Sequence, residues 1–178
     1  LAINERAYGR DHANVAVTLN HLGDAYGELG DQAKKRDLLE RALAIDERTY
    51  GRDHPNVAFP LANLGSLCGS LGDQAKAREH FGRAHAIWER AYGPEHQMTR
   101  RIRADLDGVQ ADLKFPLHAA ARRGDVDAMT QLVDGGAAVD QARGDGATPL
   151  GIACVAGQVD AARLLLEKGA EVDRAGEK

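Results

Sequence analysis

The chain has 178 residues, with 23 Lys and Arg against 27 Asp and Glu, so its formal net charge is −4 at pH 7. This length allows one or two domains with a real hydrophobic core. The mildly acidic charge offers phosphates little attraction, so we expect neither nucleic-acid nor anionic-membrane binding. No apolar run reaches the roughly 20 residues needed to cross a bilayer, and no signal-like segment opens the chain.

A tyrosine–glycine turn returns at a fixed interval in the first two thirds of the chain. Residues 8–12, 50–54 and 92–96 each begin with Tyr-Gly and end with His, and they follow one another at intervals of 42 residues. A fixed period of a few tens of residues is typical of stacked-repeat architectures. Because the chain opens at the end of one such repeat, we expect it to be a fragment of a longer array.

Apolar residues between these turns recur at spacings of three and four, the pattern of a helix with one buried face. We predict antiparallel helix pairs, each joined by a Gly-Asp turn in which glycine ends one helix and aspartate caps the next. The predicted helices span residues 12–29 and 32–49 in the first pair, and 54–71 and 74–91 in the second.

Pro60 departs from the repeat because it occupies the position of Thr18, inside a predicted helix. Proline removes one backbone hydrogen bond and crowds the preceding turn. We therefore predict a bend or a tight turn over residues 56–60.

The small and large residues of these pairs resemble the tetratricopeptide repeat. The residues that carry the resemblance are Leu22, Gly23, Tyr26 and Ala42 in the first pair, and Leu64, Gly65, Ala77, Phe81 and Ala84 in the second. The long period is similar to that of the kinesin-light-chain type. The resemblance implies a half repeat over residues 1–9, full repeats over 10–51 and 52–93, and a capping helix over 95–114.

The predicted capping helix replaces core residues of the repeat with polar ones. Arg103, Asp107 and Gln110 stand at positions that are apolar or small in the earlier copies, while Leu106 and Leu113 keep the core face. Polar residues at such positions are typical of a terminal repeat, whose outer face meets water.

A shorter repeat fills the last third of the chain. The segment Phe-Pro-Leu-His at residues 115–118 is answered 33 residues later by Thr-Pro-Leu-Gly at 148–151. This resembles the ankyrin repeat, with Phe115 in place of the usual threonine and Gly151 in place of the usual histidine, so we expect the hydrogen bonds of the motif to differ in both copies.

The ankyrin resemblance implies two repeats, over residues 115–147 and 148–178. Each would be a pair of short helices, with a hairpin loop between the repeats and the start of another hairpin at the end. The expected helices are 116–122, 126–134, 149–155 and 159–168, and the expected hairpins are 141–147 and 174–178. The whole chain is therefore expected to be an all-α helical-repeat solenoid, a tetratricopeptide superhelix joined through a capping helix to two ankyrin repeats.

The histidines do not form a metal site. His80 and His85 are five residues apart and so do not share the helix face that zinc ligands at i and i+4 need; we expect both to be solvent-exposed. His12, His54 and His96 recur once per repeat, which predicts a structural role in the turn.

We expect no enzyme, no cofactor and no metal. The glycines at residues 135–136 and 144–146 lack the spacing of a phosphate-binding loop, and no Ser, Cys or Thr is paired with a base at a recognisable spacing. Cys68 and Cys154 lie in apolar helical settings, and we expect two buried free thiols. Free thiols fit a reducing compartment, so we expect an intracellular, cytoplasmic protein.

Residues that vary between equivalent exposed positions are free to recognise a partner. The tetratricopeptide resemblance implies that the first helix of each pair lines a concave groove, and that Asn20 and Asn63 bond to the backbone of an extended peptide. The predicted groove residues are Val17, Asn20, His21, Asp24, Phe59, Asn63, Ser66 and Arg101.

A second surface is predicted from two observations. Trp88 stands where the other copies have Asn4 and Asp46. It is either an exposed interface anchor or a core residue packed under the capping helix or against the first ankyrin repeat. In the ankyrin part the resemblance places contacts at Arg122, Arg123, Arg143 and Asp145.

The expected function is non-catalytic protein–protein recognition, with a peptide or helix of the partner in the groove. The alternative is a structural spacer, or the ligand-sensing segment of a larger scaffold or signalling ATPase, with no binding of its own. A groove without an apolar floor near Val17 and Phe59 would favour this alternative. We also expect end-to-end self-association of the truncated array, because both ends would expose surfaces that further repeats cover.

Overall fold

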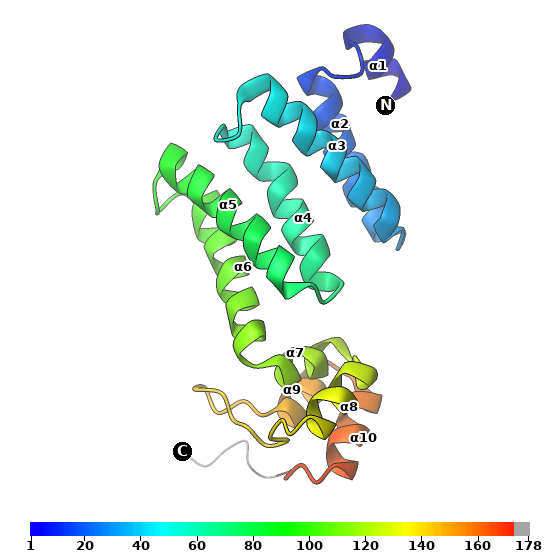
Figure 1. Ribbon diagram of the computed structural model, residues 1–178, viewed down its shortest axis with the longest axis vertical. Coiled ribbons are helices and arrows are strands. Elements are labelled where there is room, and N and C mark those ends of the chain that lie inside the picture. Colours follow the sequence, from blue (N-terminus) through cyan, green and yellow to red (C-terminus); the bar gives the residue numbers. More distant parts are fainter. Residues whose placement is uncertain (173–178) are drawn as a thin grey trace. The chain divides into compact units, whose positions relative to one another are not determined.

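The computed structural model describes residues 1–172, and every regular element within that range is a helix (Figure 1). This confirms the all-α class. The chain divides into two compact units, Leu1–Gln110 and Ala111–Lys178. Each unit has a hydrophobic core of its own. The hairpin expected at residues 174–178 lies outside the described residues.

The first unit consists of helix pairs at the predicted places. Helix α2 packs against α3, and α4 packs against α5 (Figure 1). Helix α3 also packs against α4, so the pairs form one continuous stack. The elements are α1 (Ala2–Tyr8), α2 (Ala13–Glu28), α3 (Gln32–Tyr50), the 3-10 helix η1 (Pro55–Val57), α4 (Ala58–Ser70), α5 (Gln74–Tyr92) and α6 (Gln97–Lys114), whose last residues belong to the second unit.

The recurring histidines cap the helices that follow them. The Nδ1 atom of His12 accepts a hydrogen bond from the backbone N–H of Asn14 at 3.1 Å, and His54 and His96 accept equivalent bonds at 3.2 and 3.3 Å. In each copy the tyrosine that opens the turn lies against the histidine ring, with centroids 4.5–5.1 Å apart. Capping satisfies a backbone N–H that the helix itself leaves unpaired. The predicted structural role is confirmed.

Replacing His54 with alanine should destabilise the first unit by about 0.5–2 kcal/mol, the usual cost of removing an N-terminal cap. Asparagine at the same position can accept the same bond and should recover most of the loss. Urea denaturation followed by the fluorescence of the single tryptophan measures both changes. Equal loss in the two variants would show that the cap contributes nothing.

Glycines in the first helix of each pair allow the second helix to approach closely. A Cβ atom built on Gly23 would lie 3.1 Å from Leu39, and one built on Gly65 would lie 2.6 Å from the ring of Phe81. The Phe81 ring is buried in a close-packed core and has little room to move.

Gly65→Ala should therefore destabilise the protein by about 1–3 kcal/mol, the typical cost of overpacking a core. Gly82→Ala is the matched control, because Gly82 is also helical but has open space where its Cβ would be. That variant should gain about 0.5–1 kcal/mol from helix propensity. Denaturation midpoints that shift in the same direction would contradict the packing argument.

The tight turn predicted near Pro60 is present, but it is shorter than expected. Residues Pro55–Val57 form the 3-10 helix η1, and α4 starts only at Ala58. In the preceding repeat the equivalent helix is α-helical from Ala13 onward. With α4 starting at Ala58, Pro60 lies in the first helical turn, where its missing N–H would have no partner in any case.

Helix α6 buries one face in the first unit through Ile102, Leu106 and Val109. The prediction that Leu113 continues this face is wrong, since its side chain is 43% exposed. The first unit ends at Gln110, before Leu113. The helical spacing of apolar residues therefore continues in the sequence beyond the part of α6 that packs on the first unit.

The second unit consists of two pairs of short helices. They are α7 (Pro116–Arg123), α8 (Val126–Asp134), α9 (Pro149–Val155) and α10 (Val159–Glu167), within two residues of the predicted bounds. The loop between α8 and α9 is closed at its tip by two backbone hydrogen bonds, each 2.9 Å long. The N–H of Arg143 donates to the carbonyl of Ala147, and the N–H of Gly146 donates to the carbonyl of Arg143.

The hydrogen bonds of the ankyrin-like motif differ between the two copies, as expected. Phe115 offers no side-chain cap to α7, and His118 instead donates from Nε2 to the carbonyl of Ala147 at 3.1 Å. In the second copy Thr148 accepts a bond from the N–H of Gly151 at 3.2 Å.

The thiol prediction holds for one cysteine only. Both cysteines are free, and Cys68 is buried in the core of the first unit. Cys154 is exposed, so the expectation of a second buried thiol is wrong. Apolar neighbours in the sequence do not bury a residue of a short helix, because only the face that meets another helix loses its water.

Candidate functional site

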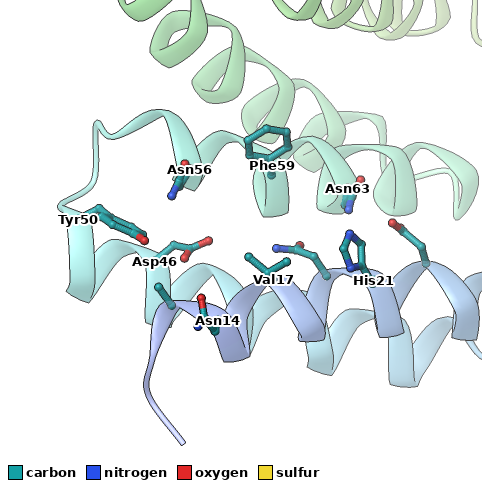
Figure 2. Close-up of a pocket in the computed structure, with 11 residues that line it drawn as sticks. Asn14, Val17, His21, Asp46, Tyr50, Asn56, Phe59 and Asn63 are labelled. Carbon is teal, nitrogen blue, oxygen red and sulfur yellow. The ribbon is translucent and has the colours of Figure 1, made fainter. Parts of the chain in front are cut away.

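A hollow of about 410 Å³ lies between α2 and the η1–α4 segment, with residues of α3 at one end (Figure 2). Six of the eight predicted groove residues line it. The full lining is Ala13, Asn14, Val17, Asn20, His21, Asp24, Asp46, Tyr50, Asn56, Phe59 and Asn63.

A second hollow of about 180 Å³ lies between α4 and α6. It is lined by Ser66 and Arg101, the two remaining predicted groove residues, and it shares Phe59 and Asn63 with the first hollow. The structure thus brings all eight predicted residues to two hollows with a common wall. We call these two hollows together the groove.

The walls of the groove combine exposed apolar side chains with amides. Val17 is 54% exposed and Phe59 is 41% exposed, although both line the first hollow. The Oδ1 atom of Asn20 is buried and has no hydrogen-bond partner among the described residues. An unpaired buried oxygen costs free energy, so its presence in a hollow marks a place where a donor is absent.

Asp46 is the most unusual residue of the groove, and sequence reasoning did not select it. Its side chain is only 5% exposed, and Figure 2 shows the carboxylate pointing into the first hollow, near Val17 and Asn56. It forms no hydrogen bond or ion pair with any residue in the described part of the chain. Burial raises the pKa of Asp46 from 3.8 to about 6.

The repeat register explains why Asp46 has no partner. One repeat earlier, Asn4 donates a hydrogen bond from Nδ2 to the Thr18 hydroxyl at 2.7 Å. The residues 42 positions later are Asp46 and Pro60, and proline offers no donor. Comparing the pair Asn4 and Thr18 with the pair Asp46 and Pro60 would have revealed the lost hydrogen-bond partner from the sequence.

Asp24 has a partial partner. Its carboxylate lies 3.7 Å from the Nζ atom of Lys35, and its side chain is half exposed to water. His21 also lines the hollow, and neither residue contacts Asp46 through a hydrogen bond or ion pair among the described residues.

Trp88 is a core residue, so the idea of an exposed anchor is wrong. It is 6% exposed and packs in the same core as Ile102 of α6. Its indole N–H donates to the carbonyl of Pro55 at 3.2 Å, and its ring meets Phe59 edge to face at 5.3 Å. Packing under α6, the other alternative, is what the structure shows. Trp88 also lines the second hollow of the groove, beside Phe59.

The ankyrin-like unit has its own hollow, of about 470 Å³, which two of the four predicted residues line. Arg122 pairs with the buried Asp112 at 2.5 Å, and the guanidinium of Arg143 lies 5.9 Å from the ring centroid of Phe115. Arg123 and Asp145 do not line this hollow. Within the loop, the hydrogen bond that Asp145 accepts from the N–H of Ala147 lowers the pKa of its carboxyl group.

The histidines of α5 are less exposed than expected. His80 is half-buried, and burial lowers its pKa. His85 accepts a hydrogen bond at 3.3 Å from Arg103 of α6, and its side chain is only 17% exposed. Among residues 1–172 no three His, Cys, Asp or Glu side chains gather as metal ligands would. Nor does any helix in that range have the length and apolar content of a bilayer-crossing segment.

Comparisons with known proteins identify two kinds of repeat in the chain. Two family models described as tetratricopeptide repeat match residues 15–56 and 36–87. A model described as ankyrin repeats, in three copies, matches residues 93–175 and so includes α6. No curated protein matches the chain.

Proposed function

The chain consists of tetratricopeptide repeats followed by ankyrin repeats, and we propose that it is an interaction module whose groove holds a peptide or helix of a partner protein. Repeats of both kinds are typically non-catalytic and serve protein–protein contacts. We propose the same for this chain, with the tetratricopeptide groove as its main binding surface.

One observation carries the proposal: the groove has an apolar floor that nothing in the described chain covers. Val17 and Phe59 remain about half exposed although they line a hollow. Exposed apolar surface rimmed by polar groups is typical of protein interaction sites. A spacer without binding would gain stability by replacing these residues with polar ones.

The amides of the groove favour an extended peptide as the ligand. Asn14, Asn56 and Asn63 lie around the first hollow, as Figure 2 shows, and Asn20 also lines it. Each amide can both donate and accept, as a peptide backbone requires. A backbone N–H of the ligand would also satisfy the unpaired Oδ1 of Asn20.

The test is a selection of displayed nonapeptides on the full chain, followed by affinity measurements. The variant Asn20→Ala/Asn63→Ala should bind the selected peptides at least about tenfold more weakly, which corresponds to about 1.4 kcal/mol. Glu79→Ala, on the exposed side of α5, is the matched control and should bind as the unmodified chain does. Selected peptides that bind the double variant equally well would contradict the groove as the binding surface, and the absence of any selected peptide would favour the spacer.

The hollow of the ankyrin-like unit is the second surface that we propose, with Arg122 and Arg143 at its walls. The free thiols of Cys68 and Cys154 support our proposal of a cytoplasmic location.

Self-association stays a prediction, and we propose that it takes place through an exposed apolar surface of the second unit. Val155, Val159 and Leu166 are exposed apolar residues of α9 and α10. We expect sedimentation velocity to show a concentration-dependent increase in mass that Val159→Lys reduces. A single monomeric species at all concentrations would contradict this expectation.

A further inference from the structure

One register position of the tetratricopeptide repeat is filled differently in each copy. In the first copy Asn4 is hydrogen-bonded to Thr18, and in the third Trp88 packs in one core with Ile102. In both copies the side chain has a partner on the following helix. In the middle copy the position holds Asp46, and the corresponding position on the following helix is Pro60.

The middle copy therefore keeps a carboxylate that the fold does not use. Asp46 is nine-tenths buried, lacks a partner among the described residues, and points into the first hollow (Figure 2). Burying an ionised group without a partner destabilises the folded state, and a ligand of opposite charge removes that cost when it binds. Near neutral pH the group is still mostly ionised, because its pKa is about 6.

No Lys or Arg side chain of residues 1–172 lines the hollow and competes for Asp46 there. The titratable groups that face it are His21 and Asp24 from α2 and Tyr50 from α3, while the lining residues of η1 and α4 carry none. Neither Lys nor Arg occurs among the described lining residues. The hollow thus presents net negative charge with two aromatic rings, of Tyr50 and Phe59, at its walls.

These walls match one class of side chain. The methylene stem of a lysine or arginine suits the apolar surface of Val17 and Phe59, and its charged end is attracted both to a carboxylate and to aromatic ring faces. A volume of about 410 Å³ admits one such side chain with part of its backbone. A metal ion fits poorly, since no three His, Cys, Asp or Glu side chains of the described residues gather as its ligands would.

We propose that the groove selects partner segments that carry a lysine or arginine, whose charged end pairs with the carboxylate of Asp46. This inference rests on the proposed function and adds the chemistry of the partner to it. Asp46 then determines specificity, while the amides hold the peptide backbone.

The test uses small blocked probes that differ only in charge. N-acetylarginine N-methylamide is cationic, and the citrulline analogue has nearly the same shape but is neutral. Each is titrated into the full chain at pH 7.5 while the side-chain amide signals of Asn14, Asn20, Asn56 and Asn63 are followed by NMR. We expect the arginine probe to bind at least about tenfold more tightly than the citrulline probe.

Asp46→Asn should remove this preference, and Asp37→Asn, at an exposed position of α3 outside the hollow, should leave it intact. The preference should also decline at pH 5, where Asp46 is mostly protonated. Equal binding of the two probes, or a preference that survives Asp46→Asn, would overturn the inference.

The peptides selected for the groove separate this inference from the proposed function. If they bind the groove but tolerate citrulline in place of every lysine and arginine, the interaction module stands and the role of Asp46 is refuted. If the arginine probe binds through Asp46 but no peptide binds, the cation site stands and the peptide groove is refuted.

Discussion

Asp46→Asn should stabilise the first unit by up to about 3 kcal/mol at pH 7.5. The folded-state pKa of about 6 lies above the unfolded value of 3.8. Each pKa unit corresponds to roughly 1.4 kcal/mol, so ionising the buried carboxyl group costs about 3 kcal/mol at neutral pH. Asparagine has nearly the same shape and carries no charge that burial could penalise.

The pH dependence gives this prediction a specific sign. Because the folded-state pKa is raised, the unmodified protein loses stability through this group as the pH rises from about 4 to 6. The gain from Asp46→Asn should therefore shrink to about 1 kcal/mol at pH 4.5. Urea denaturation followed by tryptophan fluorescence at the two pH values measures it, with Asp37→Asn as the control. A gain that is absent, or the same at both pH values, would show that Asp46 has a partner or is hydrated.

The stability result also bears on the binding proposal. A residue that destabilises the free protein, and whose removal also abolishes selection of a cation, has the signature of a functional position. If Asp46 had only a structural role, replacing it would instead lower the stability of the protein. The two measurements on one variant therefore separate these roles.

Trp88→Ala should have the opposite effect, a loss of about 3–5 kcal/mol, as is typical for truncating a large buried aromatic residue. The ring fills the core beneath α6, and its removal leaves a cavity beside Ile102 and Phe59. Backbone amides of α5 and α6 should then exchange with solvent much faster, which hydrogen exchange measures directly.

Trp88→Phe divides this loss into two parts. Phenylalanine keeps much of the ring but cannot donate to the carbonyl of Pro55. We expect about 1–3 kcal/mol for the unpaired carbonyl and the smaller ring, less than for alanine. A loss as large as that of alanine would mean that the hydrogen bond, not the packing, dominates.

The sequence predicted the helix pairs and their turns well, because the signals are local. The Gly-Asp turns, the histidine caps and the prolines at helix starts act within a few residues of themselves, and each returns at the repeat interval. Helix bounds followed from them to within a few residues, apart from the start of α4.

Burial was harder to predict, because it depends on which helix covers a given face. Leu113 and Cys154 have apolar neighbours in the sequence and are nevertheless exposed, while Trp88 is buried because α6 lies over it. Asp46 was missed for a related reason. By the repeat interval its counterpart on the following helix is Pro60, which offers no donor, and an alignment of single positions does not compare such pairs.

The position shared by Asn4, Asp46 and Trp88 has a consequence for protein engineering. The surrounding scaffold accepts an amide, an acid or an indole there with the same helix pairing, so the side chain is interchangeable while its surroundings stay constant. Chimeric arrays that exchange only this residue and its counterpart 14 positions downstream would offer different recognition chemistries on one backbone.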